Sequence, residues 1–227
     1  MQTLMTIKRS IRLLQRSIRD LMNHTPFCAK REVPDLPYKL TIEQPILPSS
    51  TMAEKCHNLR CASEQIGDYI IYPGEILSFW KVVGNPDKLR ESRCIRKGKL
   101  VVEKGGGLCQ AAGIIYHLSL IAGLKIVERY NHSVDLYGDG PRACPIGYDA
   151  TVLYGYKDLR ISNITNATLR FTLIVGEDTL RAELYSDMPL TQCEIGSQIT
   201  NTPGNINVKT FYTGTQELIA DNNYRTL

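Results

Sequence analysis

Three polar residues, Cys109, His132 and Asp149, follow one another along the chain in an order that suits thiol chemistry. A cysteine thiolate is a nucleophile, a histidine can carry its proton, and a carboxylate can hold the histidine ring in a productive orientation. Such a set attacks the carbonyl group of an amide or an ester. We therefore take the three residues as candidate catalytic residues of a cysteine-dependent hydrolase or acyltransferase.

The element that must position the thiol is a helix. Cys109 follows a run of three glycines at 105–107 and precedes an apolar run that extends to Leu124, which predicts a buried helix beginning at the cysteine. The unpaired N–H groups of a first turn favour a thiolate, but a helix end supplies only about 0.3–1 kcal/mol. Bringing a thiol pKa from about 8.5 to about 7 needs roughly 2 kcal/mol. Cys109 therefore needs a cation such as protonated His132.

The other histidines are poorer partners for the thiol. His117 lies eight residues further along the same helix, a rise of about 12 Å and a rotation of roughly 80°. His24 and His57 lie far upstream with no predicted contact. Without His132 as a partner, Cys109 is a small buried apolar residue, which is the usual fate of a free cysteine. Asp149 has a structural alternative too, because it can bond the local backbone at a strand start.

Further residues near the candidate nucleophile could bind substrate. N–H groups near 108–110 are candidates for holding an oxyanion. The glycines have a structural alternative, since they can hold positive φ or let two backbones approach closely. His57 and Cys61 lie four residues apart, but no second ligand pair accompanies them, so we expect no metal and no cofactor. The candidate substrate-binding residues are Gly105, Gly106, Gly107, Gln110, Glu75 and Ser78, of which the last two could equally cap a Pro-Gly turn.

Composition restricts the class of protein. The 227 residues are 43% hydrophobic, enough for one large domain or a domain with appendages. The net charge of +4 is concentrated near the N-terminus, so we do not expect a nucleic-acid surface. Seven cysteines at irregular spacing predict reduced thiols and a cytoplasmic protein. No run reaches the roughly 18 apolar residues of a membrane helix, and arginines interrupt any apolar core of a signal peptide.

Residues 4–23 predict one amphipathic, basic helix. We expect its apolar stripe to pack on the domain while its arginines face solvent. The alternative is a peripheral contact with the inner face of an anionic membrane. The apolar stripe consists of Ile7, Ile11, Leu14, Ile18 and Leu21, and the basic residues are Lys8, Arg9, Arg12, Arg16 and Arg19.

The remaining pattern predicts an α+β fold, an antiparallel or mixed sheet meander packed around the central helix. Helix, strand and strand would then present the three catalytic candidates, and Ala112 and Gly113 would let the strand carrying Asp149 approach closely. The expected parts are an N-terminal helix and linker at 1–35, a domain at 36–190, and a polar hairpin or fraying tail at 191–227. Within the domain the expected elements are strands at 36–43, 69–72, 148–153, 159–162, 169–175 and 179–185, a helix at 52–64, and a hairpin at 96–103 with Gly98 in its turn.

Four ordered blocks of sequence, at 72–79, 105–110, 127–133 and 149–152, resemble the VanW family over roughly residues 50–186. The resemblance implies a link to glycopeptide (vancomycin) resistance and the bacterial cell envelope, and so a peptide or cell-wall precursor as ligand. It supplies no activity. The order Cys, His, Asp also resembles that of transglutaminase-like thiol enzymes, an analogy of elements only. Two functions therefore stay open, a thiol enzyme and a non-catalytic module that binds a partner protein or precursor.

Overall fold

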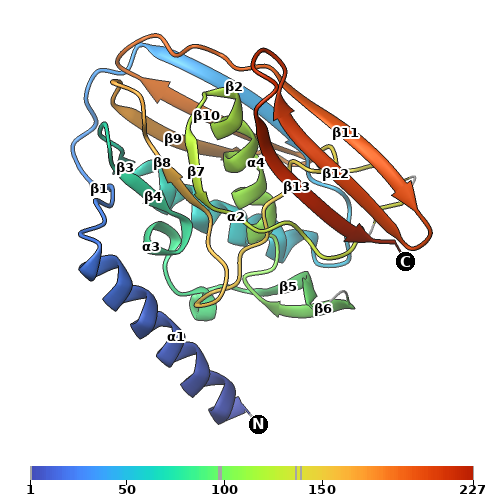
Figure 1. Ribbon diagram of the computed structural model, residues 1–227. Helices are drawn as coiled ribbons and strands as arrows, with labels where there is room; N and C mark the ends of the chain where they lie inside the picture. Colours follow the sequence, from blue (N-terminus) through green and yellow to red (C-terminus); the bar gives the residue numbers. More distant parts are fainter. Residues whose placement is uncertain (1, 97–98, 136, 139, 227) are drawn as a thin grey trace.

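The central element of the fold is a buried helix, α4 (Leu108–Ile121). The computed structural model describes residues 2–96, 99–135, 137–138 and 140–226, and α4 runs through their middle (Figure 1). Its residues are almost all apolar, so every face of it needs cover. That cover comes from α2 (Met52–Gly67), β2 (Tyr38–Pro45), β7 (Lys125–Glu128) and β10 (Thr179–Ser186). The predicted buried helix is confirmed, beginning one residue before Cys109.

One side of α4 packs against a three-stranded antiparallel sheet in the order β2-β10-β9, where β9 is Leu169–Val175. On the middle strand β10, Leu180, Ala182 and Leu184 are buried in the core. Arg181, between the first two of them, is exposed on the opposite face. The strand predicted at 36–43 is thereby confirmed as β2, and the strands predicted at 169–175 and 179–185 pair with each other as β9 and β10.

The remaining sheets of the domain are small. The strands β4 (Ile76–Ser78), β8 (Arg160–Ser162) and β7 form one antiparallel sheet in the order β4-β8-β7. The strands β5 (Glu91–Arg96) and β6 (Lys99–Lys104) pair as the predicted hairpin, whose Gly98 lies outside the described residues. The short pair β1 (Ala29–Lys30) and β3 (Tyr69–Ile70), the helix α3 (Phe79–Val83) and the 3-10 turn η1 (Pro86–Lys88) complete an α+β fold of several small antiparallel sheets.

One detail of the expected sheet differs, because the strands predicted at 148–153, 159–162, 169–175 and 179–185 do not form one continuous meander. The strand β8 pairs with β4 and β7 rather than with β9. Residues 148–152 form no strand, although their polar and apolar residues suggest one. The reason lies in their hydrogen bonds, because the carbonyl of Asp149 accepts from the Arg129 side chain (Nε–O 2.7 Å) instead of from a neighbouring strand. Gly147, at φ 96°, turns the chain just before this segment.

The C-terminal residues form a sheet rather than a tail. The strands β11 (Ile195–Thr202), β12 (Asn205–Tyr212) and β13 (Leu218–Arg225) make an antiparallel sheet beside α4 (Figure 1). Its last strand is tied to the loop after β7, because Asp135 N–H donates to the Arg225 carbonyl (2.9 Å) and Arg225 N–H donates to the Ser133 carbonyl (3.1 Å). The sequence predicts one hairpin or a frayed end here, whereas the structure has a three-stranded sheet.

The N-terminal helix α1 (Gln2–Met22) lies along the edge of the domain (Figure 1). It contacts the domain through its polar face. Arg9 pairs with Asp87 (2.7 Å), Arg16 with Glu128 (2.6 Å) and Asp20 with Arg160 (2.6 Å). The expectation that the apolar stripe packs on the domain is wrong, since its five residues are 48–75% exposed. The domain surface beneath α1 is charged, so it attracts the polar face. No helix in the described part of the chain is long and apolar enough to cross a membrane.

Replacing Asp20 with alanine is expected to lower the free energy of unfolding by about 2 kcal/mol and to loosen α1. Asp20 is buried and accepts two hydrogen bonds from Arg160 (2.6 and 3.0 Å), and a hydrogen bond to a charged group contributes about 1.5–3 kcal/mol. Chemical denaturation and hydrogen exchange of residues 2–22 measure the two effects. Asp68→Ala is the control, because its pair with Lys30 is exposed and is expected to contribute less than about 1 kcal/mol.

Candidate active site

Cys109 lies in the first turn of α4, where the glycine run delivers it. The helix is preceded by Gly107 in a left-handed conformation (φ 99°), and Gly105 also has positive φ (79°). Cys109 as a residue is partly buried, and its thiol donates a hydrogen bond to the Val152 carbonyl (Sγ–O 3.7 Å). The nucleophile candidate is therefore held in place by the backbone of a neighbouring segment.

The middle glycine is required for a different reason, close packing against β5. A Cβ atom added at Gly106 would lie 2.4 Å from the carbonyl oxygen of Ser92. The Asn58 side chain on α2 fastens the same turn, donating to the carbonyls of Gly106 (3.0 Å) and Arg90 (2.9 Å). The glycine run thus has a conformational and a packing role in the backbone around Cys109.

Gly106→Ala is expected to destabilise the protein by about 1–3 kcal/mol, because the new methyl group must push the Ser92 backbone away. Urea denaturation followed by circular dichroism measures the loss. Gly214→Ala is the matched control, since a Cβ there meets no atom within 4 Å. Equal stability of the two variants would contradict the packing argument.

His132 is held by Asp149 from two directions. The ring Nδ1 and the backbone N–H of His132 both bond Oδ2 of Asp149, at 2.5 and 2.7 Å. Because Nδ1 is used in this bond, Nε2 is the nitrogen left for the thiol, with which the imidazole interacts. Both residues lie in irregular segments rather than on the predicted strands. The Asp149 carboxylate accepts from the His132 N–H, and Arg129 donates to the Asp149 carbonyl, so side chains satisfy groups that a strand partner would otherwise satisfy.

Asp149 is itself surrounded by donors. Its second oxygen, Oδ1, accepts from Tyr224 OH (2.6 Å) on β13 and from Arg129 Nη2 (3.1 Å). Arg129 also donates to the carbonyls of Asp149 (2.7 Å) and Gly147 (3.2 Å) and to the side chain of Asn222. The carboxylate is therefore fixed by the C-terminal sheet as well as by the loop after β7.

The charges of the three residues stabilise one another. Burial raises the pKa of the Cys109 thiol, but the hydrogen bond and charge of His132 outweigh it and hold that pKa below its ordinary value. Burial likewise opposes charge on His132, yet its bonds to Asp149 and Cys109 raise its pKa to about 10. For Asp149, burial is again overcome, by His132 first and then by Arg129, so its pKa lies far below the usual range. The arrangement favours a thiolate beside an imidazolium.

The backbone around Asp149 packs over α4 beside Gly113, as expected, although the approach does not depend on the glycine. A Cβ atom added at Gly113 would lie 3.7 Å from the Asp149 Cα and 3.5 Å from the Ala150 nitrogen. These are ordinary contact distances, so the two backbones lie close together but an alanine would also fit at this position. His117 is placed elsewhere, packed against Tyr148 with ring centroids 4.7 Å apart and ring planes tilted by 52°. The structure thus brings together Cys109, His132 and Asp149.

The predicted substrate-binding side chains are engaged in other contacts. Glu75 forms an ion pair with Arg31 (2.5 Å), and Ser78 OH donates to Asp158 (2.5 Å). Gln110 Nε2 donates to the carbonyl of Pro45 (2.9 Å).

The backbone amides expected to hold an oxyanion are also partly used. Leu108 N–H donates to the Gly105 carbonyl (3.2 Å), and Gln110 N–H donates to the Gly107 carbonyl (2.9 Å). Between them, the N–H of Cys109 has no acceptor in the part of the chain that the structure describes. This amide is therefore one candidate for holding an oxyanion.

Arg129 and Tyr224 are site residues that sequence reasoning missed. Arg129 stands three residues before His132, inside one of the recognised sequence blocks, so its position was a usable signal. Tyr224 lies in a polar segment that carries no such signal, 75 residues from Asp149.

Comparison with known proteins places this chain in a family. A protein-family model described as VanW like protein matches residues 54–185, more than half of the chain. The chain belongs to the VanW-like family.

Two curated relatives of this VanW-like protein were found. The vancomycin B-type resistance protein VanW of Enterococcus faecalis (strain ATCC 700802 / V583) is 30% identical over 137 residues, 59% of this chain and 50% of the relative. The uncharacterized protein YoaR of Bacillus subtilis (strain 168) is 32% identical over 121 residues, 52% of this chain and 38% of that protein. This chain thus matches half or less of each relative's length. No solved structure matches it.

The VanW-like match does not contain the whole site. Cys109, His132, Asp149 and Arg129 lie within residues 54–185, whereas Tyr224 lies beyond them. The Tyr224 hydroxyl, which donates a hydrogen bond to Asp149, therefore comes from a segment outside the region that identifies the family.

Tyr224→Phe in this VanW-like protein is expected to cost about 1.5–3 kcal/mol of unfolding free energy. The substitution keeps the buried ring and removes one donor to a carboxylate that is largely buried. Thermal denaturation measures the change. Tyr38→Phe is the control, because Tyr38 is 45% exposed and no hydroxyl bond of it is found among the described residues. Matching losses in the two variants would remove the special role of the Tyr224 hydroxyl.

Proposed function

We propose that this VanW-like protein is a cysteine-dependent hydrolase or acyltransferase that acts on an amide or ester. The observation that carries the proposal is the placement of His132, which bonds Asp149 through Nδ1 and interacts with the Cys109 thiol. Nucleophile, base and orienting carboxylate are the parts that acyl transfer needs. Arg129 and Tyr224 position the carboxylate rather than contact a substrate.

The reaction proceeds through a thioester. The Cys109 thiolate attacks the carbonyl carbon and forms a C–S bond, while the carbonyl oxygen takes the negative charge beside the Cys109 N–H. The tetrahedral intermediate collapses by breaking the bond to the leaving nitrogen or oxygen, which takes the proton of His132 Nε2. Water or an acceptor amine then attacks the thioester, gives its proton to His132, and releases the acyl group with the thiolate restored.

The substrate class rests on a relative. One similar protein carries the name vancomycin B-type resistance protein, which supports a role near the cell envelope and a peptide or cell-wall precursor as substrate. The cytoplasmic side is the proposed location, because all seven cysteines are free thiols, as expected in a reducing compartment.

A second candidate function is a non-catalytic binding module. The observation that favours it is the set of internal contacts around the thiol, which donates to Val152, while Gln110 donates to Pro45. In this case Cys109 and the glycines shape the backbone, and the protein binds a partner or a precursor without changing it.

Acyl-enzyme trapping separates the two functions. The protein is mixed with p-nitrophenyl acetate and with a short peptide ester at pH 7, quenched in acid, and digested for mass spectrometry. Enzyme function predicts the acyl mass on the Cys109 peptide within seconds and its decay by hydrolysis. Cys109→Ala removes the adduct, and Cys61→Ala retains it. Wild-type Cys109 that acquires no acyl group, or acquires one no faster than Cys61 does, contradicts the enzyme.

A further inference from the structure

The two long faces of α1 have opposite surroundings. With about 100° per residue, the apolar stripe lies roughly 180° from Arg16, on the side of the helix that the ion pairs with the domain leave free. Exposed fractions of 61% for Leu14 and 75% for Leu21 show that nothing in the described structure covers the stripe. A contiguous apolar face of this kind on a protein surface marks a contact site.

The buried face of α1 fixes the orientation of the stripe. Arg16 reaches Glu128 (2.6 Å), and Asp20 reaches Arg160 (2.6 Å) on the neighbouring strand β8. Leu13 and the backbone of Arg9 pack on Gly155, where an added Cβ atom would lie 3.4 Å from Leu13 Cγ and 3.5 Å from the Arg9 carbonyl oxygen. The helix is therefore held to the domain by charges and close packing without using its apolar stripe.

One edge of the stripe is basic. Lys8, Arg12 and Arg19 fall about 100–140° around the helix from Ile7, all three are exposed, and none pairs with a carboxylate in the described residues. The acid of α1, Asp20, is already used by Arg160. The edge thus offers uncompensated positive charge next to apolar side chains, the combination that binds anionic lipid.

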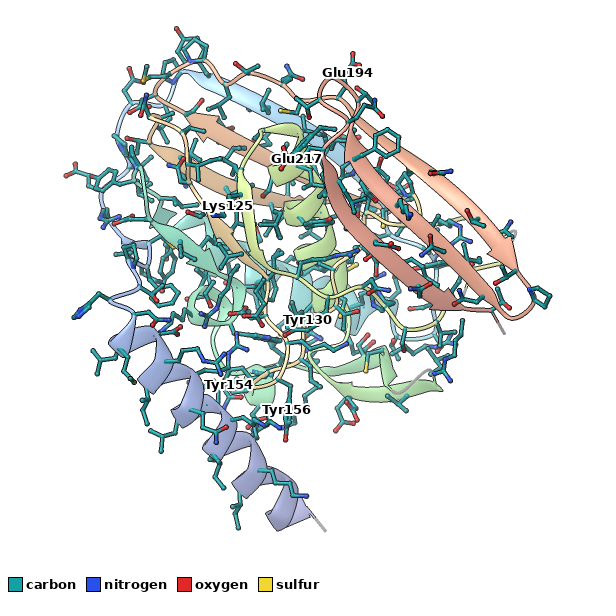
Figure 2. The ribbon with its side chains drawn as sticks, in the orientation of Figure 1. Lys125, Tyr130, Tyr154, Tyr156, Glu194 and Glu217 are labelled. Carbon is teal, nitrogen blue, oxygen red and sulfur yellow. The ribbon has the colours of Figure 1, made fainter. Side chains whose placement is uncertain are left out.

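An aromatic residue of the domain extends the same surface. Tyr156 is 40% exposed and lines a shallow hollow with Ile11, Arg12 and Gln15 of α1. Figure 2 shows Tyr156 and Tyr154 beside the helix, and Arg9 lies over the ring of Tyr154 (5.7 Å to its centroid). Tyrosine suits the boundary between lipid and water, because its ring is apolar and its hydroxyl is polar.

From these features we infer that α1 binds the protein peripherally to an anionic membrane. The stripe inserts among the acyl chains, the basic edge contacts lipid phosphates, and Tyr156 lies at the interface. A second copy of the chain fits less well, since it would bring an identical basic edge, and Asp20, the acid of α1, is already paired with Arg160. The inference is independent of the proposed thiol chemistry, because it uses none of the residues around Cys109.

Vesicle co-sedimentation tests the inference with the full chain. Wild-type protein is mixed with vesicles of phosphatidylglycerol and phosphatidylcholine (1:1) or of phosphatidylcholine alone. Binding is expected to the anionic vesicles and to fall with salt. Replacing Lys8, Arg12 and Arg19 with glutamine is expected to weaken it roughly fivefold per residue, from about 1 kcal/mol for each basic group.

Two further variants distinguish lipid binding by α1 from non-specific binding through other exposed apolar residues. Ile11→Asp combined with Leu14→Asp is expected to abolish binding, whereas Ile174→Asp combined with Ile199→Asp, at sites 46% and 50% exposed, is expected to leave it unchanged. Circular dichroism confirms that each variant is folded. The inference is overturned if wild type fails to bind anionic vesicles or if both double variants bind them alike. It is also overturned if sedimentation velocity shows a dimer that the Ile11→Asp and Leu14→Asp double variant disrupts but that added lipid does not disrupt.

Discussion

His132→Ala is expected to slow alkylation of Cys109 by iodoacetamide at pH 6 at least tenfold. In the wild type, burial raises the pKa of the thiol, but the hydrogen bond and charge of His132 reverse that effect and lower the pKa below its ordinary value. Thiolate is then present at a pH where an ordinary thiol of pKa about 8.5 is less than about 1% ionised. Without the imidazole, burial and the charge of Asp149 raise the pKa and the Val152 hydrogen bond opposes them. Because burial is the largest of these effects, the pKa is expected to move above the ordinary value.

Peptide mapping by mass spectrometry resolves Cys109 from the other six cysteines. His57→Ala is the matched control, because His57 Nε2 lies 3.6 Å from the sulfur of Cys61 on another helix and forms the comparable contact there. Its removal is expected to leave Cys109 labelling unchanged. A Cys109 that reacts only above about pH 8.5 in both wild type and His132→Ala would rule out the activated thiol.

Arg129→Met is expected to lower the free energy of unfolding by about 3–5 kcal/mol, the usual loss when one partner of a buried ion pair is removed. The Arg129 side chain is only 6% exposed, and its guanidinium donates to Asp149, Gly147 and Asn222. Urea denaturation measures the loss. Arg181→Met is the control, since Arg181 and its partner Glu43 are 46% and 48% exposed, and the expected loss there is below about 1 kcal/mol.

The same variant should change the response to acid. The pKa of Asp149 is lowered in the folded state, so its stabilising contribution is complete above the unfolded value of about 3.9 and is lost as the pH falls below it. Arg129→Met removes part of the cause, and its stability should depend less steeply on pH between about 4 and 2. If the unfolding free energy of this variant depends on pH as steeply as that of the wild type, the low pKa of Asp149 is due to His132 and Tyr224 and not to Arg129.

The core of this fold and the three candidate residues could be predicted from sequence because their signals are local. The apolar run after Cys109 has no polar face, so it has to be buried wherever the fold places it. The Cys, His, Asp order limited the partners of the thiol by simple geometry, which excluded His117 on the same helix. Glycines at 105–107 indicated tight turns, and the structure gives each a steric or conformational reason.

The incorrect predictions concern features that depend on contacts between residues far apart in the sequence. The alternation at 148–153 is that of a strand, but side-chain donors such as Arg129 satisfy the carbonyl of Asp149. The apolar stripe of α1 suggests inward packing, yet which face turns inward depends on charges at 87, 128 and 160 that fold beneath it. Tyr224 was unpredictable, because only the pairing of β13 with its neighbours brings a residue that distant to the site.

The reach of β13 into the site bears on how this domain can be exchanged or shortened. A truncated chain ending near residue 186 would retain every residue of the family match and all of the acyl-transfer candidates. It would lack the phenol on Asp149 and the Asn222 oxygen that holds Arg129, leaving two charged groups short of partners. The smallest segment that keeps the whole site, for a truncated or chimeric protein, therefore extends to the end of β13. That end lies about forty residues beyond the last residue of the family match.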